Sequence, residues 1–262
     1  MKLSNFLVSS SAFALTYAAS PSIWFTGDNR ISGQIIKQTQ KWNIPGDKVT
    51  GYYYGTQFFF SGTNEIGYYG PQPRPEGTTN HLAFSVFGYG PYSDHPNCSK
   101  SADGGPGVSC AIDFPWEYGK NYTTEVARTA QNDTDGSNRW TGTLIDDETG
   151  QRVVIGEYWT PQNYSLLTTG GNTFDELYTW EPTESKPCIP QNTYIGFYPV
   201  YHLTDGSTFT ASIDNFANLN VLGDACARAA NESNQQAYTI PGGFVFSNGV
   251  LNVEYEGHVK PL

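Results

Sequence analysis

The segment from residue 122 to residue 160 constrains the fold more than any other part of the chain. It reads YTTEVARTA, QNDTDGSN, RWTGTLIDD, ETGQ and RVVIGEYWT, so that three runs of strand-forming residues are separated by two groups of turn-forming residues. Alternation with a period of two is typical of a strand with one buried face, and short links rich in Gly, Asn and Asp close hairpins. The segment therefore predicts a three-stranded antiparallel meander.

Other runs of the same kind surround this segment. Further strands are predicted within residues 48–62, 82–90, 174–180, 193–203, 208–216 and 249–258. Only residues 223–233 have a composition compatible with a helix, and that stretch is short. The chain of 262 residues contains 28 Gly, 18 Tyr and 15 Phe with only 15% charged residues, a composition that suits strands and turns. We therefore expect residues 20–262 to form a single all-β domain, an antiparallel β-sandwich of the jelly-roll or concanavalin-like kind, with little helix.

The N-terminus has the features of a secretory leader. Lys2 supplies a basic start, residues 6–18 form an apolar stretch too short to cross a bilayer, and Thr16 and Ala18 are the small residues of a cleavage site. We therefore expect residues 1–19 to be a signal peptide and the protein to be secreted. The formal net charge is −11, and no cluster of Lys or Arg occurs, which excludes nucleic acid and anionic membranes as expected partners.

The cysteine count agrees with secretion. Four cysteines, Cys98, Cys110, Cys188 and Cys226, allow three pairings, of which we favour the two local ones, Cys98–Cys110 and Cys188–Cys226. No CxxC pair occurs and the four histidines are scattered, so we expect neither a metal site nor a cofactor. The segment NDTDGSN (132–138) lacks the acidic residue that completes a calcium loop, and we expect a hairpin turn there. Five glycosylation sequons begin at Asn97, Asn121, Asn132, Asn163 and Asn231.

The central part of the chain resembles a family catalogued as domain of unknown function 3472. The resemblance rests on GYYGPQ, then FSVFG, a glycine-rich loop, a W-x-x-G-x-x-Y element at residues 116–122, and the later RWTGTLIDDETG and IGEYWTP. It covers about residues 50–180. The resemblance implies a secreted, jelly-roll-like β-domain found near carbohydrates, and it implies no activity.

Aromatic side chains are the candidates for ligand binding. In EIGYYGPQ the side chains of Tyr68 and Tyr69 must point to opposite faces of a strand, so that one packs in the core and the other, with Gln72, can line a sugar-binding surface. Trp116 and Trp159 are further candidates for stacking on a sugar ring. Trp140, whose alternation partners are apolar, is expected in the core.

Carboxylates decide whether an enzyme is expected. Glycosidases use two of them, and Glu157 and Glu176 are the best candidates because both lie in aromatic strand sequence. Glu254, Glu256 and His258 also share a strand face, which we interpret as the protected face of an edge strand. No serine elbow, P-loop or dinucleotide motif occurs.

Three functions remain open from the sequence. The first is non-catalytic recognition of a neutral extracellular or cell-wall polysaccharide by exposed aromatic residues. The second is a glycoside hydrolase that uses paired carboxylates on such a polymer. The third is a structural or host-interaction protein that binds no sugar.

Overall fold

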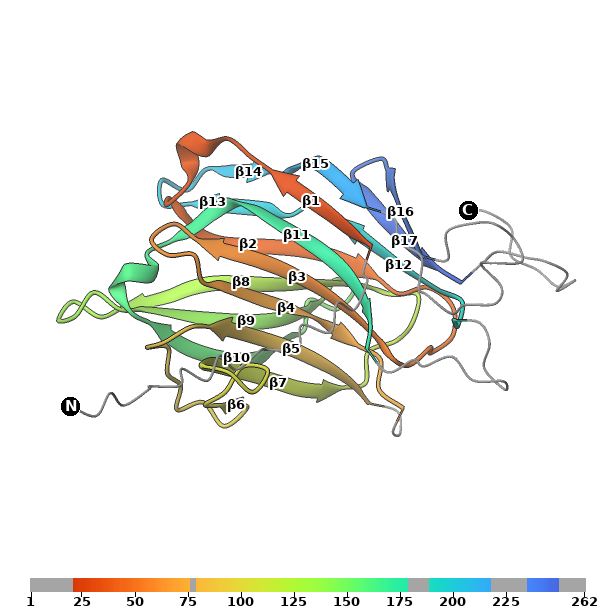
Figure 1. Cartoon of the computed structure of the whole chain (residues 1–262), viewed down its shortest axis with the longest axis horizontal. Coiled ribbons are helices and arrows are strands. Elements are labelled where there is room, and N and C mark those ends of the chain that lie inside the picture. Colours follow the sequence, from red (N-terminus) through yellow and green to blue (C-terminus); the bar gives the residue numbers. More distant parts are fainter. Residues whose placement is uncertain (1–20, 76–78, 179–188, 218–234, 250–262) are drawn as a thin grey trace, which may run out of the picture.

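The fold is a two-layer arrangement of antiparallel strands (Figure 1). The computed structural model describes residues 21–75, 79–178, 189–217 and 235–249. These residues form seventeen strands and two short 3₁₀ turns, η1 (Asn29–Ile31) and η2 (Gln162–Tyr164), and within them there is no α-helix. The expected all-β antiparallel sandwich is therefore confirmed. No helix in this part of the chain has the length and apolarity needed to cross a membrane.

Each layer is defined by its hydrogen-bonded neighbours. The first layer has the order β15 (Ser212–Ala217), β1 (Ser22–Thr26), β11 (Leu167–Leu177), β3 (Tyr52–Phe60), β4 (Ile66–Gln72), β5 (Asn80–Phe87), β7 (Gly107–Phe114) and β6 (Cys98–Ser99). The second layer has the order β14 (Thr208–Thr210), β13 (Val200–Leu203), β2 (Ile35–Asn43), β8 (Asn121–Gln131), β9 (Asn138–Asp146) and β10 (Arg152–Thr160). Beside β13, strand β12 (Asn192–Phe197) also pairs with β2 and carries β17 (Gly243–Asn248) and β16 (Gln235–Ile240).

The meander predicted from residues 122–160 is confirmed as β8, β9 and β10. These strands pair in sequence order, and residues 132–137 form the tight turn between the first two, closed by a hydrogen bond from the Asn132 amide to the Ser137 carbonyl. Several predicted segments lie outside the described residues: the leader (1–19), the helical candidate (223–233), Cys188, Cys226 and the final strand with Glu254, Glu256 and His258.

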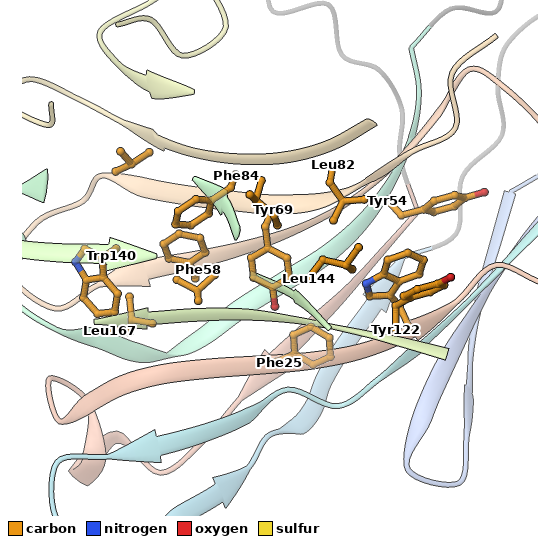
Figure 2. Close-up of a cluster of buried hydrophobic side chains, with 14 of the residues drawn as sticks. Phe25, Tyr54, Phe58, Tyr69, Leu82, Phe84, Tyr122, Trp140, Leu144 and Leu167 are labelled. Carbon is orange, nitrogen blue, oxygen red and sulfur yellow. The ribbon is translucent and has the colours of Figure 1, made fainter. Parts of the chain in front are cut away.

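Aromatic rings from both layers fill the space between them (Figure 2). Phe84 of β5 stacks on Tyr158 of β10 with ring centroids 4.5 Å apart, and Phe60 of β3 meets the edge of Trp140 of β9 at 5.7 Å. Gly142 is needed beneath Phe84, because a Cβ atom there would lie 2.6 Å from the ring. The expectation that Trp140 is a core residue is confirmed, since its side chain is fully buried.

Buried polar side chains in the core are mostly paired with one another. Gln40 donates to Thr173, and Thr56 bonds to both of them, while the Trp140 indole donates to Thr160. Such pairing removes most of the cost of placing polar atoms away from water. Asp175 of β11 is an exception, because neither of its carboxyl oxygens accepts a hydrogen bond of good geometry from a described residue.

The predicted Cys98–Cys110 disulfide is confirmed and joins β6 to β7. Gly156 of β10 makes room for it, since a Cβ atom at this position would lie within 2.8 Å of both sulfur atoms. The bridge thereby fixes the loop from Ser99 to Gly107 at the margin of the first layer.

Removal of this disulfide by the double substitution Cys98→Ala/Cys110→Ala is expected to lower the free energy of unfolding by about 2–3 kcal/mol, because it releases a short closed loop in the unfolded chain. Urea denaturation followed by near-ultraviolet circular dichroism would measure the change. An unchanged midpoint would contradict the prediction.

Candidate functional site

A row of polar and aromatic side chains crosses the outward face of the first layer. Directly opposite residues on neighbouring strands share a face. The registers connect Trp24 to Asn172, Asn172 to Gln57, Gln57 to Tyr68, Tyr68 to Ser85 and Ser85 to Ser109. We call these six residues the cross-strand row. Six strands about 4.8 Å apart give it a length of about 24 Å.

The outward direction of the row follows from its neighbours along each strand. Tyr69 next to Tyr68, and Ile23 and Phe25 on either side of Trp24, are all core residues. Trp24 is 41% exposed at one end of the row, whereas Asn172 and Ser85 are buried within it. The row therefore presents the Trp24 ring at one end and the half-buried side chains of Gln57 and Tyr68 in the middle.

A line of small residues runs beside the row. The registers place Phe174 opposite Gly55, and Gly70 opposite Ala83. A Cβ atom on Gly55 would lie 2.2 Å from the Phe174 ring, so a larger residue cannot stand there. The Tyr53 ring meets Phe174 and Tyr68 edge to face, with centroids 5.5 Å from each. Tyr53 thus packs between the two rings on the outward face.

Two carboxylates and two tyrosines gather at this place. The Tyr68 hydroxyl lies 2.9 Å from each oxygen of Asp103 and donates its proton to that carboxylate. Burial, and then the neighbouring Asp103 carboxylate, raises the pKa of Glu176 above its usual range. Tyr53 pairs with Glu176 across the strands, and its buried hydroxyl has no partner among the described residues. We call Tyr53, Tyr68, Asp103 and Glu176 the tyrosine–carboxylate cluster.

The backbone holds Asp103 in an unusual conformation. Its φ is 48°, in the left-handed region that side-chain-bearing residues seldom adopt. Two hydrogen bonds between Ala102 and Gly105 close the turn around it, and the nearby disulfide anchors the loop. Backbone strain of this kind persists only where the surroundings enforce it, and it is often found at functional sites. Asp103 is exposed to solvent, so a ligand can reach this carboxylate.

The cluster has the components of acid–base chemistry. A carboxyl group whose pKa is raised keeps its proton to higher pH and can act as a general acid, and a second carboxylate nearby can act as base or stabilise positive charge. Tyrosine hydroxyls can orient a sugar or a scissile bond by hydrogen bonding. Within the described residues, no group of three or more His, Cys, Asp or Glu side chains is arranged to hold a metal ion.

Two of the predicted ligand-binding residues are buried. Tyr69 is 1% exposed and packs beside Phe58 in the core (Figure 2), where its hydroxyl accepts a hydrogen bond from Gln38. Trp116 is 3% exposed and meets Trp42 edge to face at 5.5 Å. The prediction that the Trp116 ring is available to a ligand is therefore wrong. Of the two tyrosines, Tyr69 is the one that packs in the core.

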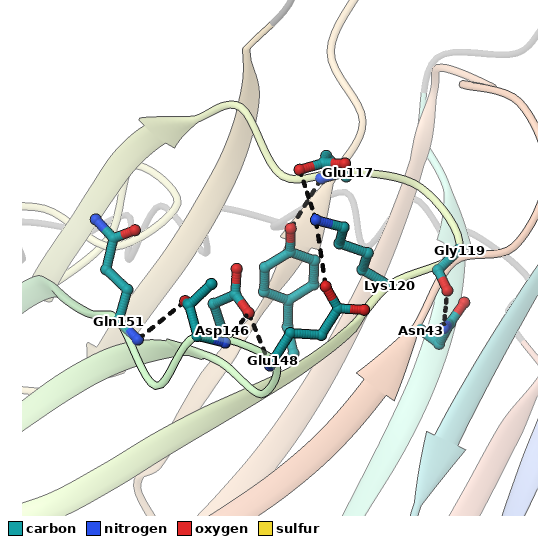
Figure 3. Close-up of polar contacts among 9 residues, drawn as sticks. Asn43, Glu117, Gly119, Lys120, Asp146, Glu148 and Gln151 are labelled. Atoms are coloured by element: carbon teal, nitrogen blue, oxygen red, sulfur yellow. Dashed lines mark hydrogen bonds and ion pairs between the residues drawn. The ribbon is translucent and has the colours of Figure 1, made fainter.

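The connection that carries Trp116 is tied down by polar contacts (Figure 3). Lys120 forms ion pairs with Glu117 and with Glu148 of the β9–β10 turn, and Asn43 donates to the Gly119 carbonyl. These contacts keep the loop against the second layer and so keep the Trp116 ring inside.

Tyr68 and Gln72 lie on the outward face of the first layer, as a sugar site there would require. Gln72 is half-buried, accepts a hydrogen bond from Arg74, and pairs with His81 across the strands. Their role in binding remains a prediction.

Glu157 and Trp159 lie on the outward face of the second layer. Both alternate with Tyr158, whose ring is in the core. Glu157 accepts a hydrogen bond from Thr141 and lies 3.7 Å from Arg139. Trp159 is half-buried beside the nearly parallel ring of Tyr92, with centroids 6.4 Å apart.

Glu157 and Glu176 therefore cannot work as a pair. Glu176 alternates with Asp175, which points into the core from the first layer, whereas Glu157 alternates with Tyr158, which points into it from the second. The two glutamates face away from each other across the sandwich. The prediction of these two residues as paired catalytic carboxylates is wrong, and Asp103 is the carboxylate that accompanies Glu176.

The sequons differ in accessibility. Asn121 and Asn163 are exposed, whereas Asn97 and Asn132 are half-buried. The Asn97 amide nitrogen, the atom that would carry a glycan, donates to the Ile155 carbonyl at 3.1 Å. Glycosylation stays a prediction, and Asn121 and Asn163 fit it best. Asn231 lies outside the described residues.

Sequence reasoning missed Trp24, Tyr53, Gln57 and Asn172. Their alternation with apolar residues could have placed each on an outward face. Their juxtaposition could not be deduced, because Trp24 and Asn172 are far apart in the chain and meet only through the pairing of β1 with β11.

Comparison with known proteins gives a weak likeness in fold. No family model matches the chain, and no curated protein matches its sequence. A solved structure of scytalido-glutamic peptidase with a peptide-based transition state analog covers 88% of this chain and 99% of its own, at 13% identity and a TM-score of 0.46. A marine PL-14 alginate lyase from Aplysia kurodai covers 70% of this chain and 72% of its own, at 14% identity and a TM-score of 0.35. At these identities the similarity concerns the β-rich fold alone.

Proposed function

We propose that the protein is a secreted protein that binds a neutral polysaccharide across the outward face of its first layer. The observation that carries this proposal is the cross-strand row, in which Trp24, Asn172, Gln57 and Tyr68 follow one another over four neighbouring strands. An extended polymer can lie along such a row with a sugar ring against the Trp24 indole, while amides and hydroxyls bond its hydroxyl groups.

The charges at the site favour a neutral polymer. Asp103 and Glu176 both lie beside the row, and the whole chain has a formal net charge of −11. An acidic polysaccharide would be repelled from two carboxylates, whereas sugar hydroxyls can donate hydrogen bonds to them.

Trp24→Ala is expected to weaken retention on the polysaccharide that the wild-type protein binds by about fivefold to tenfold, because one stacking contact contributes on the order of 1 kcal/mol. Tyr68→Ala is expected to weaken retention further, because this change also removes the hydrogen bond from the Tyr68 hydroxyl to the Asp103 carboxylate. Pull-down on insoluble glucan, chitin and mannan, followed by affinity electrophoresis, would measure both.

Trp159→Ala is the matched control, because it removes an indole from the opposite face of the sandwich. If the polymer binds to the outward face of the first layer, this variant should bind like the wild type. Weaker binding by Trp159→Ala alone would move the site to the second layer. No retention of the wild-type protein on any of these polymers would overturn the proposal.

A second candidate function is hydrolysis of the bound polymer. It is favoured by one observation: Glu176 has a raised pKa and a second carboxylate, Asp103, as its neighbour. In this scheme Glu176 protonates the leaving oxygen, and Asp103 acts as base or stabilises the positive charge that develops on the sugar.

A further inference from the structure

A cavity of about 340 Å³ lies at one end of the sandwich, away from the tyrosine–carboxylate cluster. It is bounded by the ends of β8 and β9 and by the connection from β10 to β11. Its lining includes Arg128, Gln131, Asn138, Gln162, Ser165 and Leu166. The volume is at the lower limit of pockets that hold small molecules.

The cavity exists because the core becomes polar at this end of the second layer. On β8 the inward alternation passes from Val126 to Arg128, and on β9 it passes from Trp140 to Asn138. Arg128 lies directly opposite Trp140, and the register shifts just beyond it. Arg128 therefore lies at an inward-facing position of β8, where the alternation of the strand predicts an apolar core residue.

Two of the lining side chains have unused hydrogen-bonding capacity. Asn138 is only 3% exposed, and its side-chain oxygen has no partner among the described residues. The Arg128 guanidinium forms no ion pair with any described residue. Arg128 can therefore bind the anionic group of a ligand without giving up an existing ion pair.

The residues that line the cavity also indicate which charge a ligand should have. Among the described residues that line it, Arg128 is the only charged one and none is acidic. Three side-chain amides and the Ser165 hydroxyl supply neutral donors and acceptors, and Leu166 is the one apolar side chain among these residues. A ligand with an ammonium group would find no counter-ion here, which argues against a free amino acid.

We propose that this cavity binds a sugar-sized carboxylate, a hexuronic acid, with its carboxylate on Arg128 and its hydroxyls on the amide side chains. Arginine holds carboxylates in a two-pronged geometry, and amides suit vicinal hydroxyls. This site is separate from the polymer-binding face and does not depend on the function proposed for it.

The test is a ¹H–¹⁵N NMR titration of the mature protein with sodium D-glucuronate at constant ionic strength. We expect saturable shifts confined to residues around the cavity, including the Trp140 indole. D-glucuronamide, which lacks only the charge, is expected to bind at least about tenfold more weakly, the usual value of a hydrogen bond to a charged group. N-acetyl-alanine, a carboxylate without sugar hydroxyls, should also bind more weakly.

Arg128→Gln is expected to weaken glucuronate binding by about tenfold or more. Gln162→Glu changes an exposed residue at the rim, so it preserves the fold, and it should abolish binding by charge repulsion. Arg152→Gln, an exposed arginine on the outward face of the second layer, is the control and should bind normally. No saturable shift with glucuronate, equal binding of glucuronamide or N-acetyl-alanine, or normal binding by Gln162→Glu would overturn the proposal.

Discussion

Substitution of Asp175 by Asn is expected to stabilise the protein at pH 8 to 9 by about 2–4 kcal/mol, because it removes a carboxyl group that the fold must keep uncharged. Asp175 is fully buried on the inward side of β11, opposite Tyr54, whose ring stacks on Tyr194 at 4.5 Å. Burial raises the pKa of Asp175 to about 8, with the nearby Asn248 side chain opposing the rise and Glu176 adding to it.

The sign of the pH dependence follows from proton binding. The folded protein holds the Asp175 proton up to pH 8, whereas the unfolded chain releases it near pH 4, so the folded state binds more protons between these values. The contribution of Asp175 to stability should therefore be most favourable below about pH 4, fall as the pH rises toward 8, and change no further above it. The full penalty is at most about 6 kcal/mol, and the unpaired amide hydrogens of Asn offset part of the gain.

Guanidinium unfolding at pH 4, 6 and 8 would measure this. Asp175→Asn should be the less stable protein at pH 4, by the cost of its unpaired amide hydrogens, and should become the more stable one as the pH rises toward 8. Asp94→Asn, a substitution at an exposed carboxylate, is the control and should leave the pH dependence of the wild type unchanged. Parallel pH profiles for the wild type and Asp175→Asn would show that Asp175 does not carry this proton.

Glu176→Gln is expected to lower the turnover of any polysaccharide that the protein cleaves by about 10²–10⁴-fold, since it removes the proton that general acid catalysis donates. Binding should change little, because the amide keeps the size of the carboxyl group. Release of reducing ends from neutral glucans and mannans would measure turnover, and the pull-down assay would measure binding.

The pH profile distinguishes a proton donor from a merely structural carboxylate. The Asp103 carboxylate helps to raise the pKa of Glu176. Asp103→Asn should therefore lower that pKa, and the activity that remains without the Asp103 carboxylate should have its alkaline limb at lower pH. Glu157→Gln, on the opposite face, is the matched control and should have full activity.

Two outcomes would contradict the catalytic assignment: turnover that survives Glu176→Gln, and turnover that a chelator abolishes. Because paired carboxylates also serve in peptide hydrolysis, the substrate panel includes an unfolded protein at acid pH. Cleavage of that protein without cleavage of any glycan would show that the substrate is a polypeptide and not a polysaccharide. The assignment of Glu176 and Asp103 as the reacting carboxylates would then still hold.

The sequence by itself determined the local structure of this protein. The meander over residues 122–160 was predictable because alternation and turn residues act within a few positions. The Cys98–Cys110 bridge was predictable for a similar reason, since two cysteines close in the chain favour a local bridge. The opposite directions of Tyr68 and Tyr69 followed from the geometry of a strand alone.

Only the tertiary structure decided which strands became neighbours and which layer each joined. Alternation indicates that the side chains of Glu157 and Glu176 each point away from the core. It cannot show that they lie on opposite faces of the sandwich. Likewise, nothing local indicated that Trp116 is buried against Trp42 or that Asp103 approaches Tyr68. Strand pairing depends on contacts between distant segments and on how two layers bury their aromatic faces together, and a period of two carries no information about the partner.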